Sequence, residues 1–279
     1  GSGIKATAIA AGGNHTCAIL DNSAVMCWGY NASGQLGLGT NTDSPNPSAV
    51  GSGITAKSIA AGGNHTCAIL DNSSAVMCWG ENDQGQLGLG TNTDRPNPSA
   101  VGSGITAKAI TTGTEHTCAL LDDDSVKCWG RGDEGQLGSG KTNDIISPPS
   151  ASIVLGTNID ATAIASGKFH TCAIIDNSSI KCWGYNASGQ LGIGGTNNRG
   201  GGDADGDSDM GDILPTVDLG TGRTARGIIA GDNHTCAILD NASIKCWGSN
   251  ISGELGIGEP GNRGDNSSEM GDNLPVISL

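Results

Sequence analysis

One histidine, two cysteines and one tryptophan recur together five times, and these copies account for every His, Cys and Trp in the chain. The first copy is HTCAILDNSAVMCWG, from His15 to Gly29. Imidazole nitrogens and thiolates bind zinc, and two thiols can also join in a disulfide. The question is therefore whether the five copies are metal sites, thiol sites or parts of the architecture.

The spacing of the cysteines favours disulfides. A hairpin centred on Asn22, in the turn sequence DNS, places Cys17 opposite Cys27. Opposed strand positions can meet disulfide geometry, and closing a loop of about ten residues stabilises a protein by roughly 2–3 kcal/mol. A zinc ion would find only three ligands, His15 and the two cysteines, and no C-x-x-C motif. The predicted pairs are Cys17–Cys27, Cys67–Cys78, Cys118–Cys128, Cys172–Cys182 and Cys236–Cys246.

Composition and charge narrow the class of protein. Cysteines that all pair within their own copies indicate an oxidising compartment, so we expect an extracellular or cell-surface protein. The net charge of −14 argues against a nucleic-acid partner. No apolar run reaches the roughly 18 residues that a membrane span needs. The sequence shows no signal peptide and begins in phase with a repeat, as a processed or excised segment would.

Five repeats position the recurring residues. Aligned on His-Thr-Cys, they span residues 1–50, 51–101, 102–155, 156–219 and 220–279, the last two with acidic inserts. Repeats of this length are typical of stacked or radially arranged supersecondary units, and we treat them as blades of one propeller domain. The first two repeats are nearly identical, which indicates recent duplication or pressure for sameness.

Within a repeat, short strands alternate with turns rich in Gly and Asn. The hairpin places Ile19 opposite Val25 and Thr16 opposite Trp28, so both of its faces carry apolar side chains, as expected for strands between two neighbouring sheets. The predicted fold is all-β: a β-propeller-type array of five blades, each of about four antiparallel strands, forming a closed ring or an open arc.

The pattern W-G-x-N-x-x-G-Q-L-G-x-G, preceded by H-T-C-A-I-L-D, resembles the repeat of the regulator of chromosome condensation family. The match covers essentially the whole chain, and it departs only slightly in the last repeat, where Glu254 replaces Gln. The resemblance implies four-stranded blades, usually seven in a ring, and makes the histidine part of the repeat consensus. We expect the histidine ring nitrogens to bond backbone groups near the Gly loops. We expect the tryptophans to pack between blades with bonded N–H groups, with a carbohydrate-binding ring of Trp as the alternative.

Asparagine occurs in many Asn-x-Ser/Thr sequons, which are acceptors for N-glycans in a eukaryotic secretory pathway and ordinary turn residues otherwise. Three of them lie in the predicted hairpin turns, where a glycan would be exposed. The candidates are Asn14, Asn31, Asn64, Asn72, Asn177, Asn186, Asn233, Asn241, Asn250 and Asn266.

The insert of the fourth repeat carries alternating aspartates in a Gly-rich loop: Asp203, Asp205, Asp207 and Asp209. Carboxylate oxygens on a flexible backbone suit Ca²⁺, although the loop lacks the EF-hand pattern. The two interpretations are a calcium site and a solvated acidic loop. No other cofactor is expected.

An enzyme is the poorest candidate, because the sequence offers no single-copy nucleophile–base pair, phosphate loop or catalytic metal motif. The resemblance implies protein binding, including nucleotide exchange on a small GTPase, but an acidic, Cys-paired chain with five repeats fits exchange least. We predict a non-catalytic structural or adhesive protein that assembles head to tail into a glycosylated surface fibre. The alternative is a secreted monomeric propeller that binds a protein or glycan through its loops, and the oligomeric state discriminates between the two.

Overall fold

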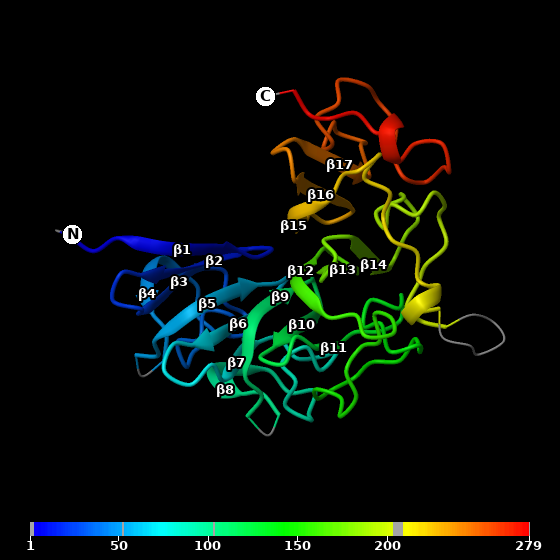
Figure 1. Cartoon of the computed structure of the whole chain (residues 1–279). Helices are drawn as coiled ribbons and strands as arrows, with labels where there is room; N and C mark the ends of the chain where they lie inside the picture. Colours follow the sequence, from blue (N-terminus) through cyan, green and yellow to red (C-terminus); the bar gives the residue numbers. More distant parts are fainter. Residues whose placement is uncertain (1–2, 52, 103, 203–208, 279) are drawn as a thin grey trace. The chain divides into compact units, whose positions relative to one another are not determined.

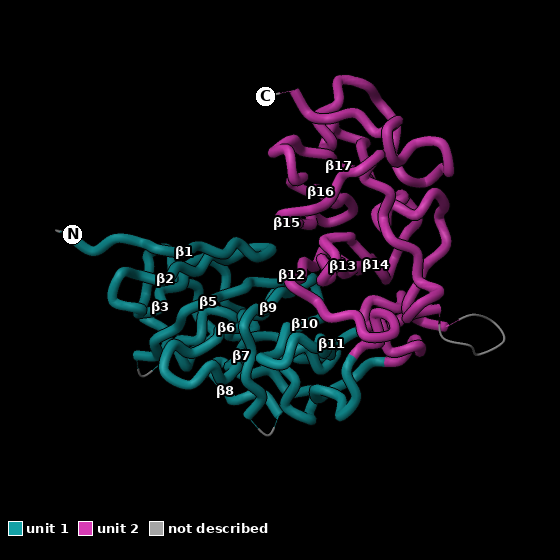
Figure 2. Tube along the Cα trace, in the orientation of Figure 1, with its two compact units in different colours: residues 1–131, 144–152 teal, residues 132–143, 153–279 magenta. Residues whose placement is uncertain are grey.

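The computed structural model describes residues 3–51, 53–102, 104–202 and 209–278. It contains two compact units, which are described separately (Figure 2). The first comprises residues 1–131 and 144–152, and the second comprises residues 132–143 and 153–279. Regular structure in the described residues consists of strands and two short 3-10 helices, so the predicted all-β class is confirmed.

The first unit contains three antiparallel sheets, one for each of the first three repeats (Figure 1). Two of them have four strands in sequence order and the third has three. The strands are β1 (Ala6–Ala11), β2 (His15–Leu20), β3 (Val25–Gly29) and β4 (Ser44–Ala49); β5 (Ala56–Ala61), β6 (His65–Leu70), β7 (Val76–Gly80) and β8 (Arg95–Ala100); and β9 (Ala107–Thr112), β10 (His116–Leu121) and β11 (Val126–Gly130).

The second unit contains the three-stranded sheets of the fourth and fifth repeats. Their strands are β12 (Ala161–Ser166), β13 (His170–Ile175) and β14 (Ile180–Gly184), then β15 (Ala225–Ala230), β16 (His234–Leu239) and β17 (Ile244–Gly248). After the third strand, each of these repeats forms a 3-10 helix, η1 (Gly211–Ile213) or η2 (Gly271–Asn273).

A buried lysine holds each 3-10 helix against its sheet. Lys181 Nζ donates hydrogen bonds to the carbonyl oxygens of Leu155 and Gly211, both at 2.7 Å. Burial removes water from the Lys181 ammonium group, and this desolvation lowers the pKa of Lys181. Lys245 repeats the arrangement in the fifth repeat. The inserts thus replace the regular fourth strand of the first two repeats with a turn fixed by a side chain.

The predicted hairpin register is confirmed. Cys17 pairs with Cys27, Ile19 with Val25 and Thr16 with Trp28. The tip of the hairpin is tight because Ser23 adopts a left-handed conformation with φ of 64°. The equivalent turn residues of the other repeats are also left-handed: Ser74, Asp124, Ser178 and Ala242.

The core lies between adjacent sheets. Trp79 is fully buried and packs in one cluster with Leu36 and the Cys17–Cys27 disulfide of the preceding repeat. Trp129 packs in the same way on the second repeat, and in the other unit Trp247 packs on the fourth. A tryptophan therefore covers the disulfide-bearing face of the repeat before its own, as predicted for a residue between blades.

Candidate functional site: the junctions between repeats

Each repeat contains one disulfide that joins its two central strands. The bonds are Cys17–Cys27, Cys67–Cys78, Cys118–Cys128, Cys172–Cys182 and Cys236–Cys246. Both sulfurs belong to paired positions of a hairpin, with Cα atoms 4.1 Å apart in every case. With the exception of Cys236, each cysteine is at most 2% exposed. The cysteines are therefore part of the core and offer no accessible thiol.

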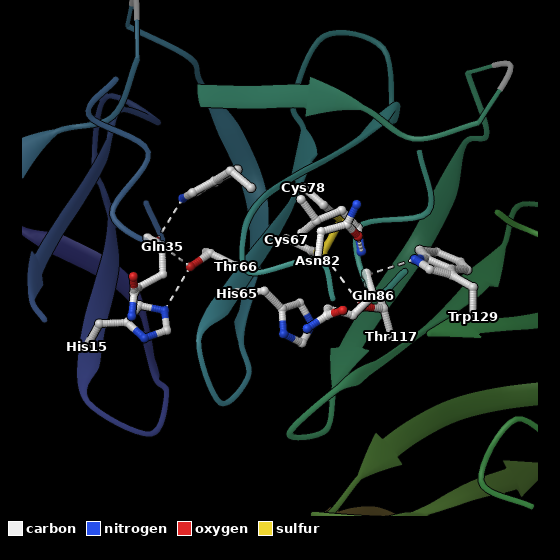
Figure 3. Close-up of a disulfide and its surroundings, with 12 residues drawn as sticks. His15, Gln35, His65, Thr66, Cys67, Cys78, Asn82, Gln86, Thr117 and Trp129 are labelled. Atoms are coloured by element: carbon white, nitrogen blue, oxygen red, sulfur yellow. Dashed lines mark hydrogen bonds between the residues drawn. A yellow bond between two sulfur atoms is a disulfide. The ribbon is translucent and has the colours of Figure 1, made fainter. Parts of the chain in front are cut away.

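Histidine and threonine form the polar contact across a junction. His15 Nε2 lies 2.8 Å from the hydroxyl oxygen of Thr66 in the next repeat, and His65 Nε2 lies 3.0 Å from that of Thr117 (Figure 3). In the second unit, His170 makes the same contact to Thr235 at 2.9 Å. The expectation that the histidine nitrogens bond backbone groups was wrong for these contacts, because Nε2 bonds a threonine hydroxyl of the next repeat instead.

The backbone carbonyl of the glutamine in G-Q-L-G receives two donors from the next repeat. Gln35 O accepts the hydroxyl of Thr66 at 2.8 Å and the indole N–H of Trp79 at 2.9 Å. The expectation of bonded Trp N–H groups is thereby confirmed for four of the five tryptophans; Trp28 has no such bond among the described residues. The same acceptor serves the later repeats: Gln86 with Thr117 and Trp129, Gln136 with Thr171 and Trp183, and Gln190 with Thr235 and Trp247.

These bonds fix the tautomer of the histidine. A threonine hydroxyl has one hydrogen, and Thr66 gives it to Gln35 O. His15 must therefore donate from Nε2, which leaves Nδ1 as an unprotonated nitrogen with no hydrogen-bond partner among the described residues. Burial lowers the pKa of His15 to about 4 and that of His65 to about 3. The ring lies against Gly12, where an added Cβ would come within 2.4 Å of His15 Cε1. A neutral, buried donor of this kind is structural.

The loop after each tryptophan is organised by an asparagine side chain. Asn31 donates both amide hydrogens, to the carbonyl oxygens of Thr40 and Thr42, and its Oδ1 accepts the N–H of Leu36. Asn186 makes the same three bonds in the fourth repeat, and Asn250 makes two of them in the fifth. These three sequon residues are buried.

The other sequons divide by exposure. Those exposed to solvent are Asn14, Asn72, Asn177, Asn241 and Asn266, and those half-buried are Asn64 and Asn233. At two hairpin tips, the exposed Asn177 and Asn241 accept the N–H of the serine two residues later through Oδ1. Glycosylation at the exposed positions stays a prediction.

Three of the four candidate calcium ligands of the acidic insert, Asp203, Asp205 and Asp207, lie outside the described residues. Asp209 is described: its Oδ1 accepts the N–H groups of Gly200 and Gly202, at 2.7 and 3.1 Å. Within residues 3–202 and 209–278, apart from 52 and 103, no group of three or more His, Cys, Asp or Glu side chains is placed to hold a metal ion. The two described helices are too short to cross a membrane.

Sequence reasoning overlooked two parts of the junction, the threonine and the glutamine carbonyl. The threonine left a signal, because Thr follows His in every repeat. The carbonyl left none, since any residue supplies one. Together, the recurring polar groups bond one repeat to the next. Their role is to hold neighbouring repeats in register.

Comparison with known proteins places this arrangement in a family. The profile of the RCC1-like domain matches residues 2–276. The chain is 31% identical over 261 residues to the ultraviolet-B receptor UVR8 of Arabidopsis thaliana, covering 92% of this chain and 56% of UVR8. It is 39% identical over 203 residues to the probable E3 ubiquitin-protein ligase HERC4 of Homo sapiens, covering 71% of this chain and 19% of HERC4. The chain thus spans about half of one curated relative and about a fifth of the other.

The fold also resembles that of a protein of known structure. Prp20p from Saccharomyces cerevisiae, whose structure was described together with its binding to Gsp1p and histones, superposes with a TM-score of 0.77 at 22% identity. The match covers 99% of this chain and 64% of Prp20p.

Proposed function

This chain belongs to the RCC1-like domain family, and from that premise we propose that it is a non-catalytic, extracellular structural or adhesive protein whose copies assemble head to tail into a glycosylated surface fibre. The observation that carries the proposal is the buried disulfide in every repeat. Such bonds persist in oxidising surroundings and are rare where glutathione keeps thiols reduced.

The distribution of polar groups supports a non-catalytic role. A catalytic site needs one asymmetric set of residues, whereas the histidines, threonines and tryptophans here occupy the same position in successive repeats. Burial also lowers the pKa of His65 to about 3, so it stays neutral at physiological pH. The ligase activity in the name of HERC4 does not weaken the proposal, because the match covers only 19% of that protein.

The first alternative is a secreted monomer that binds a protein or a glycan through its loops. Its support is the family itself, since Prp20p is described as binding other proteins. A scaffold for nucleotide exchange is a second alternative, and it is disfavoured because an intracellular exchange factor has no use for a disulfide in each repeat. The net charge of −14 disfavours DNA as a partner, but it does not disfavour a basic protein such as a histone.

Negative-stain electron microscopy of the natively secreted protein, with an enzymatically deglycosylated sample beside it, tests the proposal. Regular filaments support a structural fibre. Single discs in both samples contradict the fibre and favour the monomeric binding protein. Recovery of the natural protein from inside the cell with free thiols would overturn the extracellular assignment itself.

A further inference from the structure

The tryptophan of the third repeat is connected to the disulfide of the second repeat through two polar groups (Figure 3). Trp129 Nε1 donates to the backbone carbonyl oxygen of Gln86 at 3.0 Å, and the Thr117 hydroxyl donates to the same oxygen at 2.8 Å. The Thr117 oxygen lies 3.9 Å from Cys67 Sγ, one sulfur of the Cys67–Cys78 bond. A short path of contacts therefore runs from an indole to a disulfide of the neighbouring repeat.

The same path recurs in the second unit, between the fourth and fifth repeats. Trp247 Nε1 and the Thr235 hydroxyl both donate to Gln190 O, at 3.0 and 2.9 Å. Thr235 Oγ lies 4.0 Å from Cys172 Sγ, which belongs to the Cys172–Cys182 bond. Each unit therefore contains the arrangement within itself, between two of its own repeats.

The indole and the disulfide share one dry part of the core. Trp129, Cys67 and Cys78 are fully buried and belong to the same hydrophobic cluster. The three corresponding residues of the second unit are fully buried in one cluster as well. Trp79 adjoins Cys78 in the sequence, but it belongs to the cluster of the Cys17–Cys27 disulfide. The indole that packs with a disulfide is therefore the one supplied by the next repeat.

An indole and a disulfide are a natural donor and acceptor of electrons. Indole is the most easily oxidised aromatic side chain, and absorption of ultraviolet light makes it a strong reductant. A disulfide accepts an electron into its antibonding S–S orbital, which weakens the bond. Electron transfer is fastest between groups in the same packed core. Excitation of Trp129 thus places a reductant beside Cys67–Cys78.

We propose that these tryptophans reduce the disulfides packed with them when they absorb ultraviolet light, so that the protein cleaves its own core disulfides. One electron passes from the indole of Trp129 to the Cys67–Cys78 bond, which breaks into a thiolate and a thiyl radical. The oxidised indole gives up its Nε1 proton and the thiolate takes up one. The products are an indolyl radical, a thiol and a thiyl radical, and no other reductant is consumed. This inference goes beyond the proposed function and requires only that the disulfides are formed.

The hydrogen bonds of the path stabilise the charges that the reaction creates. An indole N–H donates more strongly once the ring is positive, and Gln86 O already accepts it from Trp129. The Thr117 hydroxyl can turn its hydrogen towards Cys67 Sγ when that sulfur becomes negative. Its oxygen still accepts from His65 Nε2, 3.0 Å away. Thr117 is therefore a positioning residue for the reduced sulfur.

Irradiation of the whole, disulfide-bonded protein tests the proposal. Light at the long-wavelength edge of indole absorption excites tryptophan, whereas disulfides absorb little of it. The sample is held under argon with an alkylating reagent that traps new thiols, and peptide mapping assigns each cleaved pair. We expect labelled thiols at Cys67–Cys78 and Cys172–Cys182 in the irradiated wild type and none at these pairs in the dark. An irradiated wild type without label at either pair overturns the proposal.

Single substitutions identify the donor. Trp129→Phe should lose the label at Cys67–Cys78 and keep it at Cys172–Cys182, and Trp247→Phe should do the reverse. Each variant thus carries its own control pair in the other unit. Trp79→Phe is the matched control for sequence proximity, and it should keep the label at Cys67–Cys78. Undiminished label at Cys67–Cys78 in Trp129→Phe, or its loss in Trp79→Phe, contradicts the assignment.

The wild type provides a second measurement, which decides the question if a phenylalanine variant does not fold. The yield of thiols should follow the absorption of indole as the wavelength is varied. Nitrous oxide destroys solvated electrons and should leave the yield unchanged, because the transfer takes place inside the junction. A yield that follows disulfide absorption, or that nitrous oxide abolishes, overturns the inference.

Discussion

The Nε2 atom of His15 lies 2.8 Å from the hydroxyl oxygen of Thr66, 51 residues later in the chain. Because the same hydroxyl donates to Gln35 O, the imidazole is the donor and the threonine acts as both donor and acceptor. One small side chain therefore satisfies two groups of the preceding repeat inside a junction that water does not reach.

Replacing Thr66 by valine keeps the shape of the side chain and removes both bonds. The His15 N–H is left buried without an acceptor, so we expect the free energy of unfolding to fall by about 1–3 kcal/mol. Chemical denaturation at dilute protein concentration measures the change. Thr16→Val is the control, since Thr16 has no partner in the described chain, and it should change stability by less than about 0.5 kcal/mol. Equal losses in the two variants would contradict the assigned role.

The buried histidines make the free energy of unfolding depend on pH. The pKa of His65 falls from 6.5 to about 3 because burial disfavours the imidazolium, with smaller contributions from His15 and His116. Between these values the unfolded chain binds a proton that the folded chain does not, so stability is lost as the pH falls from 6.5 towards 3. One such group contributes about 1.4 kcal/mol per pH unit in this window.

His65→Phe tests this dependence, because it retains a ring and removes the titrating group. The free energy of unfolding of the variant should fall less steeply on acidification than that of the wild type, by about 1.4 kcal/mol per pH unit for this residue. Urea unfolding at a series of pH values compares the slopes. Above pH 7 the two proteins should share one slope, and parallel curves below pH 6 would contradict the prediction.

The disulfides should differ in their resistance to reductant. The eight cysteines of the first four repeats are at most 1% exposed, whereas Cys236 in the fifth repeat is half-buried. Thiol–disulfide exchange requires access of a thiolate to a sulfur. Limited reduction of the native monomer, followed by alkylation and peptide mapping, should therefore label Cys236 and Cys246 first. Simultaneous labelling of all pairs would show that global unfolding governs reduction instead.

Glycan occupancy should follow the exposure of the sequons. In secreted protein from a eukaryotic cell, we expect glycans at exposed positions such as Asn72, Asn177 and Asn241 and none at Asn31 or Asn186. An attached sugar would remove an amide hydrogen that Asn31 needs for its loop. Mass spectrometry after enzymatic release of glycans reads each site. A glycan on Asn31 in the folded fraction would contradict the expectation, and unmodified Asn72 would weaken the glycoprotein proposal.

The local structure of a repeat could be predicted from the sequence. Alternation of side chains about a turn was enough to place Cys17 opposite Cys27, because strand pairing has a period of two and the turn fixes the register. The family resemblance supplied the arrangement of strands in repeats. These predictions depend on side chains that recur, and recurrence is visible without a structure.

The junction chemistry was less accessible. Gln35 takes part through its main chain, and a carbonyl group has no signature in the sequence. The 3-10 helices were also missed, because they depend on Lys181 and Lys245, which stand where the first two repeats have methionine. A lysine in place of methionine on a strand normally predicts an exposed side chain. Lys181 and Lys245 are buried instead, because nearby carbonyl oxygens accept their hydrogen bonds.

The main-chain acceptor at Gln35 has a consequence for how such a protein can change in length. The Thr66 hydroxyl and the Trp79 indole recognise a peptide carbonyl, which every repeat supplies whatever its side chains. A repeat gained or lost by recombination would therefore find working neighbours at once, without compensating substitutions on either side. Copy number is then free to drift faster than the contacts that hold the copies together, and the near-identity of the first two repeats is what a recent gain would leave behind.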